Sequence, residues 1–368
     1  VKSIVLDIQS GLVRGALLVK TVNDGGIEEI HIASVVTKAI SEKTHVINAE
    51  HLAKKTYKLI SDVIEHLARD AGGKHLNNIS YVLSSPWIFS KLKTIKIDYE
   101  KETEINSKII GDLVKEEAKN NPDKADAKPI EQRIFEIRLN GYPTVSFEGK
   151  RARRLEVSIS TSFGSSSFLD KVRAVVDRHI HIKSHSVHSA LLMQYSALRE
   201  ILKNRSEFVY IHAHRELTDI IIVKDGLCKH IASFPFGTSM LVRKVSAVTK
   251  ETVEASDSLL SLLQGGKLND EQQENINRII TPVINEWSDQ CIKSFDGVFD
   301  MNTTPRQLYL SVHSHFEIFK KSLMLKGGYN FEVVSCDTLN VGNSIMFDKE
   351  SAQSNLIKMY IYALSNEM

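Results

Sequence analysis

The chain has 368 residues, of which 47 are Lys or Arg and 45 are Asp or Glu, so its formal net charge is +2. Two surplus charges provide no cationic surface that neutralises many phosphates, and we therefore expect no nucleic-acid partner. The composition is that of a globular protein, and no apolar run approaches the roughly 18 residues that span a bilayer.

The cysteine count and the first residue bear on the cellular setting. Cys228, Cys291 and Cys336 lie far apart and are odd in number, which indicates neither a disulfide framework nor a metal knuckle and favours a reducing interior. The chain opens at Val1 inside a strand pattern, so we expect further residues to precede it.

The first part of the chain predicts a sheet with one helix. Apolar runs and helical spacing predict three strands, a helix and a fourth strand at residues 2–7, 12–20, 27–36, 49–69 and 79–83. The turn-forming Gln9-Ser10-Gly11 joins the first two strands, and Ser84-Ser85-Pro86 ends the fourth.

The pattern of apolar and polar residues changes after Pro86. Apolar and polar residues alternate in three stretches, at 95–99, 135–139 and 155–159, a pattern typical of a sheet with one wet face. Residues 104–119 between the first two stretches predict a helix that ends in a polar break at 120–123. We therefore predict a small strand-helix-strand-strand subdomain over residues 87–163.

The opening pattern then returns. After a helix at 165–177, a strand at 180–187 and a helix at 190–202, strands at 208–211, 219–223 and 227–233 repeat the first forty residues. The rest predicts helices at 241–263 and 270–295, the second broken or kinked near Pro282, then a strand at 307–311, a helix at 316–325, a strand at 331–335 and a terminal helix at 351–365.

This order of elements predicts four parts. The first domain comprises residues 1–86 and 164–202, and the inserted α+β subdomain comprises 87–163. The second domain comprises 203–350, and the terminal helix, 351–368, returns to the first domain.

Two copies of a strand-turn-strand-strand-helix unit, with a subdomain inserted into the first, resemble the actin-like ATPase superfamily. The place of the insert and the Arg154-Leu155-Glu156 strand within residues 131–159 resemble the FtsA/PilM-like branch of that superfamily. The resemblance implies an α/β fold of duplicated actin-like (ribonuclease H-like) domains with a small insert in the first.

The resemblance also places three nucleotide loops on this sequence. The first phosphate loop corresponds to residues 7–11, the second to 212–219 and the adenosine loop to 310–315. Carried over residue by residue, the cofactor-binding positions are Asp7, Ser10, Gly11, Thr218, Asp219 and Ser311.

The loops depart from the family pattern at their glycines. Gln9, His214, Arg215, Val312 and His313 stand at glycine positions, where side chains hinder the approach of backbone N–H groups to phosphate. The family's carboxylate that orders the attacking water is replaced by His212. We therefore predict a degenerate nucleotide pocket with no catalytic residues, no bound cofactor and no ATP hydrolysis. The alternative is a working ATPase that binds Mg-ATP through Asp7, Ser10, Thr218 and Asp219.

Two further patterns have both a functional and a structural interpretation. The pairs His212/His214 and His313/His315 come from loops that line one cleft, so they are candidates for a metal or anion site. No Cys or ordered carboxylate accompanies them, which favours polar filling of an abandoned pocket and predicts no metal. The basic stretch at 150–154 is either a solvated strand edge or a contact for an acidic partner.

The resemblance implies a cytoplasmic actin-fold scaffold at the inner face of a bacterial membrane. In PilM-like proteins the partner is the short cytoplasmic tail of a pilus membrane protein, and in FtsA-like proteins it is the tail of the tubulin-like division protein. Both roles remain open at this point, as does self-association, and neither role requires ATP turnover.

Overall fold

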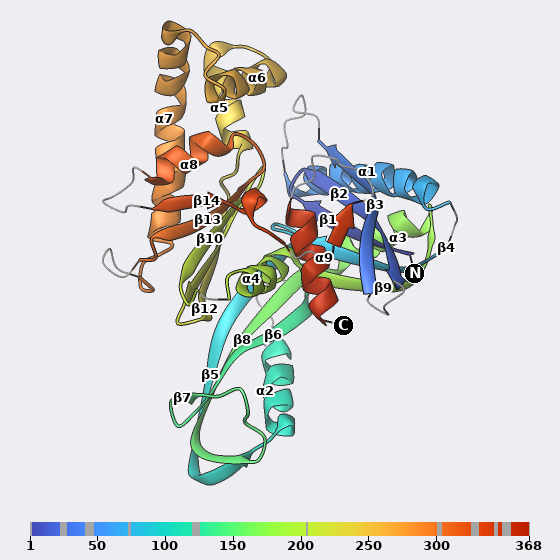
Figure 1. Ribbon diagram of the computed structural model, residues 1–368, viewed down its shortest axis with the longest axis vertical. Coiled ribbons are helices and arrows are strands. Elements are labelled where there is room, and N and C mark those ends of the chain that lie inside the picture. Colours follow the sequence, from blue (N-terminus) through green and yellow to red (C-terminus); the bar gives the residue numbers. More distant parts are fainter. Residues whose placement is uncertain are drawn as a thin grey trace.

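The computed structural model describes residues 2–22, 28–40, 48–72, 75–119, 126–203, 205–299, 304–324, 331–341, 345–347 and 355–367. Figure 1 shows two α/β bodies side by side, one blue and one yellow to orange, with a narrower cyan and green body below them. Each body contains one sheet. Among the described residues, no helix has both the length and the apolar character needed to cross a bilayer.

The first body is built on a sheet with strand order β15-β3-β2-β1-β4-β9. Its strands are β1 (Lys2–Gln9), β2 (Leu12–Val22), β3 (Glu28–Ala39), β4 (His75–Leu83), β9 (His181–Ser189) and β15 (Ile345–Phe347). Ile4 packs against α1 (Ala49–Asp70) and α3 (Ser166–Asp177), and Val5 packs against α4 (Ala190–Ile201) and α9 (Asn355–Glu367). Since successive side chains of a strand point to opposite faces, helices cover this sheet on both sides.

The second body repeats the strand order of the first, as β12-β11-β10-β13-β14. Its strands are β10 (Phe208–Ala213), β11 (Thr218–Lys224), β12 (Leu227–Phe234), β13 (Gln307–Val312) and β14 (Glu332–Ser335). Its helices are α5 (Ser239–Thr249), α6 (Val253–Gln264), α7 (Asp270–Lys293), α8 (Phe316–Met324) and the short η1 (Cys336–Thr338). In both bodies the first strand pairs antiparallel with the second and parallel with the fourth. The predicted duplication and α/β fold class are confirmed.

The insert is a third sheet with the order β5-β8-β6-β7. Its elements are β5 (Ile88–Ile105), α2 (Ser107–Lys119), β6 (Ala127–Leu139), β7 (Tyr142–Pro143) and β8 (Lys150–Ser165). Apolar residues from α2 and one face of the sheet, among them Ile110, Leu155 and Val157, form its own core. The strand-helix-strand-strand pattern is therefore present, with the two-residue β7 added to it. The predicted break at 120–123 lies outside the described residues.

Three sequence-based expectations need correction. Residues 345–347, predicted to belong to the second domain, form β15 and pair with β3 in the first sheet. The helix predicted at 241–263 is two helices, because Lys250 adopts a left-handed conformation with φ 63° and Thr252 caps the start of α6. Of the predicted break or kink near Pro282, the break is wrong, since α7 continues through this residue to Lys293, and the kink stays a prediction.

Candidate functional site

The first phosphate-loop segment and the second face each other between the two bodies. The first follows β1, where Ser10 and Gly11 turn the chain into β2 and Gly11 adopts φ 82°. The second connects β10 to β11. Both segments therefore lie at the carboxyl end of a strand. Since β1 runs parallel to β4, and β10 runs parallel to β13, this is the edge of the sheet where α/β proteins commonly place their sites.

Asp7 is buried at the end of β1. Its Oδ2 accepts a hydrogen bond of 2.7 Å from Gln9 Nε2 and lies 3.8 Å from Arg14 Nη1. Its Oδ1 has no hydrogen-bond partner among the described residues. Burial raises the pKa of Asp7, although Arg14, Gln9 and His214 act in the opposite direction.

Asp219, the second residue of β11, is a buried carboxylate of the second body. Its Oδ1 accepts hydrogen bonds from Ser233 Oγ and, at 2.9 Å, from Ser85 Oγ, while Oδ2 lies 2.9 Å from His214 Nε2. Burial is the largest influence on its pKa and raises it, but these hydrogen bonds and the nearby His214 outweigh burial and lower the pKa.

Gln9 and His214 join the two carboxylates into one chain. Gln9 Oε1 lies 3.4 Å from His214 Nδ1, so the sequence of contacts runs from Asp7 through Gln9 and His214 to Asp219. We call Asp7, Gln9, Ser85, His214 and Asp219 the clasp. All of its members are buried, and its two ends belong to different bodies.

A second set of contacts flanks the clasp. The backbone N–H of Glu216 donates to Ser10 Oγ at 3.4 Å, and Arg243 holds the Glu216 carboxylate through two contacts of 2.9 and 3.0 Å. The Arg215 side chain covers Gly11 so closely that a Cβ added there would lie 3.3 Å from Arg215 Nε. The Arg215 side chain and the Glu216 backbone thus lie against the first loop.

The four histidines of the cleft have separate partners. His212 Nδ1 accepts a 3.1 Å hydrogen bond from Gln194, and burial lowers the pKa of His212 well below its ordinary range. His313 lies 3.4 Å from Arg215 Nη1, and burial followed by that positive charge lowers its pKa to about 3.

His315 Nε2 lies 2.8 Å from Asp257, on α6. Within the described ranges, no group of three or more His, Cys, Asp or Glu side chains could hold a metal ion. Each of the four histidines thus contacts a side chain of the protein, and whether they bind an ion stays untested.

Two of the predicted cofactor-binding residues have their hydroxyls engaged elsewhere. Thr218 Oγ1 donates to the Phe236 carbonyl at 2.6 Å and accepts from Trp287 Nε1 at 2.8 Å. Ser311 Oγ accepts from Tyr210 at 3.3 Å. Asp7, Ser10, Gly11 and Asp219 do lie together in the cleft, and whether these six residues bind a cofactor stays a prediction.

Sequence reasoning missed Ser85, which links the two bodies. The signal for it was the Ser84-Ser85-Pro86 segment at the end of β4, because the ends of β4 and β1 lie side by side in the parallel pair. Its bond to Asp219 depends on the placement of the second body, which local patterns do not specify.

The described residues do not fit a nucleotide triphosphate in this conformation. The backbone N–H of His214 donates to Leu217 and that of Glu216 to Ser10, so neither faces an open phosphate site. His214 and Arg215 are 1% and 9% exposed, and they occupy positions where the family pattern has glycines. Asp7 Oδ1, which has no hydrogen-bond partner among the described residues, still suits a hydrated cation.

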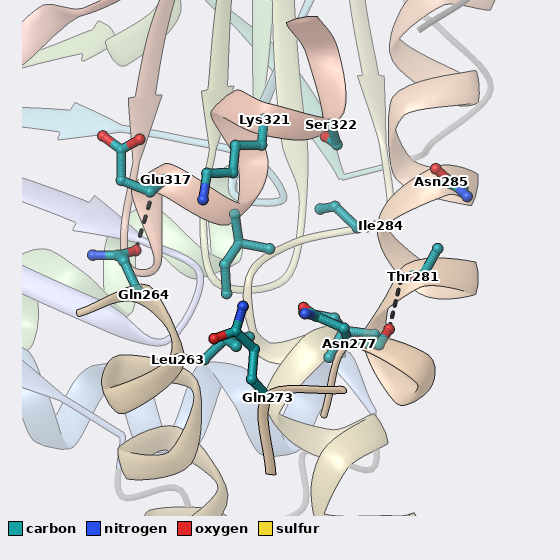
Figure 2. A pocket seen from close by; sticks show the side chains of 12 residues that line it. Leu263, Gln264, Gln273, Asn277, Thr281, Ile284, Asn285, Glu317, Lys321 and Ser322 are labelled. Atoms are coloured by element: carbon teal, nitrogen blue, oxygen red, sulfur yellow. Dashed lines mark hydrogen bonds between the residues drawn. The ribbon is translucent and has the colours of Figure 1, made fainter. Parts of the chain in front are cut away.

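A separate pocket of about 330 Å³ lies between α6, α7 and α8 of the second body. Its lining combines amide side chains, among them Gln273 and Asn277, with apolar ones such as Ile284 (Figure 2). One edge is closed where the Glu317 backbone N–H donates to Gln264 Oε1 at 3.2 Å. This pocket does not open the clasp to a ligand, since none of the clasp residues lines it.

A wider groove of about 520 Å³ runs between the insert and the second body. It is lined by β6, by the segment after β7 and by the β11–β12 turn. Ile134 and Val145 in its lining are 43% and 103% exposed, and the adjacent Tyr142 is 78% exposed. Exposed apolar side chains gathered at a groove are typical of a surface that contacts another polypeptide.

Comparison with known proteins shows the fold. No protein-family model matches the sequence, and no curated protein matches it. A chain of a solved structure described as the PilM-PilN type IV pilus biogenesis complex is 12% identical with a TM-score of 0.64, covering 99% of this chain and 97% of that chain.

Other solved structures are less similar. The ethanolamine utilization protein EutJ from Carboxydothermus hydrogenoformans is 11% identical with a TM-score of 0.43, covering 91% of this chain and 84% of that chain. A protein with an actin-like ATPase fold from Bacteroides thetaiotaomicron is 10% identical with a TM-score of 0.41, covering 92% of each chain. The likeness to a chain of the PilM-PilN structure confirms the expected actin-like fold.

Proposed function

We propose that this protein is an actin-fold adaptor of type IV pilus assembly, which binds a short segment of a membrane-associated pilus protein and does not hydrolyse ATP. The observation that carries the proposal is the clasp, whose buried side chains occupy the cleft where an actin-like ATPase needs space for phosphates. Likeness in fold to the PilM-PilN structure supports the pilus setting.

The clasp argues against turnover on two physical grounds. A phosphate site needs inward-facing N–H groups and small residues, whereas the second loop turns its N–H groups to Leu217 and Ser10 and fills the cleft with His214 and Arg215. Hydrolysis also needs a group that orders the attacking water, and His212, at the corresponding position, is buried against Gln194.

The groove between insert and second body supports binding of a polypeptide. Burying the exposed apolar side chains of Ile134, Val145 and Tyr142 would gain about 25 cal/mol for each Å² removed from water. Among the described charged residues of the lining, Glu136 and Arg138 pair with each other at 2.8 Å, which leaves Asp225 as a negative charge at the edge of an otherwise apolar groove. We place the tail of the pilus partner in this groove, and through that partner the protein reaches the inner face of the cell membrane.

The experiment is a binding titration with a labelled synthetic peptide, the cytoplasmic tail of the PilN-type protein of the same organism. Fluorescence anisotropy should show saturable binding that weakens at least tenfold in Val145→Asp. Val248→Asp is the matched control, because Val248 is 51% exposed on α5, away from the groove. Phosphate release from Mg-ATP should equal that of buffer.

Two outcomes would contradict the proposal. Steady phosphate release that is lost in Asp7→Ala would make the protein an ATPase. Binding of the tail of the tubulin-like division protein in place of the pilus tail would assign the protein to the FtsA-like role.

A second candidate function is Mg-ATP binding through Asp7, Ser10, Thr218 and Asp219, in a conformation in which the clasp has opened. One observation favours it, the buried Asp7 Oδ1 that has no partner among the described residues. It requires Gln9 and His214 to move out of the cleft and Thr218 to leave Trp287.

A further inference from the structure

The cleft between the two bodies is bridged directly by hydrogen bonds. Ser85 Oγ donates to Asp219 at 2.9 Å, Gln9 Oε1 lies 3.4 Å from His214, and Glu216 N–H donates to Ser10 at 3.4 Å. The bonded residues are 134, 205 and 206 positions apart in the sequence. These contacts therefore fix the relation of the bodies to each other rather than the shape of either one.

Each side of the clasp is anchored in its own body by one of the chain's 2 tryptophans. Trp87 Nε1 donates to the Gln9 carbonyl at 3.1 Å, and the Trp87 ring stacks on Phe168 with centroids 4.2 Å apart. Trp287 Nε1 donates to Thr218, the residue before Asp219, and is fully buried in the second core. Both ends of the clasp are thus held by large, buried side chains that restrict their movement.

We infer that the clasp is a built-in latch: side chains of the two bodies, in place of a nucleotide, hold the cleft closed, and the closed form is the resting state with or without Mg-ATP. A ligand shifts a conformational equilibrium only through a difference in its affinity for the two states. The side chains of the clasp occupy the phosphate positions in the closed form, and His214 and Arg215 still stand at the glycine positions when the cleft opens. Mg-ATP therefore gains no site in either form and shifts the equilibrium in neither direction.

Two serines donate to the same carboxylate oxygen of Asp219, one from each body. Ser85 donates to Asp219 Oδ1 from the first body, and Ser233 donates to the same atom from within the second body. Removing the Ser85 hydroxyl breaks a bond across the cleft, whereas removing the Ser233 hydroxyl does not. A hydrogen bond to a charged group lost in this way should raise the open fraction about tenfold or more.

The test is hydrogen exchange of the Glu216 amide, which donates across the cleft to Ser10 and exchanges when the cleft opens. In the full chain, exchange should be about tenfold faster in Ser85→Ala than in the wild type. It should stay within about twofold of the wild type in Ser233→Ala, the matched control for loss of a hydroxyl at Asp219. Saturating Mg-ATP should leave the wild-type rate unchanged.

A distance measurement supplies an independent readout of the same latch. Spin labels at Lys58→Cys on α1 and Ser258→Cys on α6 report one position on each body, and the three native cysteines are buried. The wild-type distance should be single and insensitive to Mg-ATP, and it should lengthen or broaden when Ser85, Gln9 and His214 are all replaced by Ala.

Two results would overturn the latch. One is a wild-type distance that shortens, or a Glu216 amide whose exchange slows at least tenfold, when Mg-ATP is added. The other is equal acceleration of exchange in Ser85→Ala and Ser233→Ala. The latch does not require the adaptor role, so failure of the pilus peptide to bind leaves both readouts unaffected.

Discussion

Replacement of Gly237 by Ala tests how closely the second loop is packed against the start of α5. A Cβ at residue 237 would lie 2.4 Å from the carbonyl carbon and oxygen of Arg215 and 2.5 Å from the backbone nitrogen of Glu216. Ordinary contact begins at 3.4 Å, so the loop must retreat by about 3.4 − 2.4 = 1.0 Å. These are backbone atoms, which cannot rotate aside as the tip of a side chain can.

Two backbone hydrogen bonds oppose that retreat. Thr238 N–H donates to the His214 carbonyl and Ser239 N–H to the Arg215 carbonyl, both at 2.9 Å. Overpacking of about 1–3 kcal/mol and the weakening of two hydrogen bonds worth about 0.5–1.5 kcal/mol each give a loss of about 2–6 kcal/mol. The second loop carries His214, so Gly237→Ala should also accelerate exchange of the Glu216 amide.

The assay is urea unfolding at neutral pH followed by tryptophan fluorescence. Gly111→Ala is the matched control, because Gly111 lies inside α2 with nothing within 4 Å of an added Cβ. The control should be stabilised by about 0.5–1 kcal/mol through the helix preference of Ala. A Gly237→Ala variant within about 0.5 kcal/mol of the wild type would refute the packing argument.

Three further substitutions probe buried polar groups of the site. Thr218→Val removes the hydroxyl that bonds the Phe236 carbonyl and Trp287 Nε1, and it should lower the free energy of unfolding by about 2–4 kcal/mol in urea titrations. Burial lowers the folded-state pKa of His313 to about 3, below an unfolded value of about 6.5, so its contribution to stability is present above pH 6.5 and is lost as the pH falls toward 3. In His313→Gln, the free energy of unfolding in urea should fall by about 2–3 kcal/mol less than in the wild type between pH 6.5 and pH 3. This figure allows for the partial exposure of the His313 ring. Burial raises the folded-state pKa of Asp7, so its ionisation destabilises the fold as the pH rises; Asp7→Asn should therefore raise the thermal midpoint more at pH 7 than at pH 4, and an equal effect at both pH values would contradict this reading.

The duplicated architecture could be predicted because local chemistry marks its turns. The second hairpin turns at Asp225-Gly226, where both residues adopt positive φ, 54° and 76°, a conformation that these residue types favour. The helix predicted at 165–177 is present as α3, with Ser165 as the cap of its first turn. The prediction of the actin-like fold rested on the order of the helices and strands and not on the nucleotide loops, which depart from the family pattern.

The errors fall where tertiary placement overrides the local pattern. β15 has three residues, too few to show periodicity, and it exists because the chain crosses back to β3 before α9. Lys250 gives no signal of a left-handed turn, so two helices looked like one. Pro282 leaves α7 unbroken, so proline in a helix interior did not mark an end of the helix here.

Only part of the candidate site could be predicted from the sequence, because one of its residues depends on how the two bodies are placed. The family resemblance placed Asp7, Ser10, Gly11 and Asp219 in the two phosphate loops, and in the structure these loops lie against each other. Ser85 was missed because its partner, Asp219, comes from the other copy.

Calorimetric titration of the wild-type protein with Mg-ATP tests the central claim most directly. If the side chains of the clasp hold the phosphate positions, the titration should release no saturable heat, and Asp7→Ala should behave as the wild type does. A micromolar dissociation constant that disappears in Asp7→Ala would contradict the claim, because it would mean that the cleft opens to seat a triphosphate against the carboxylate of β1.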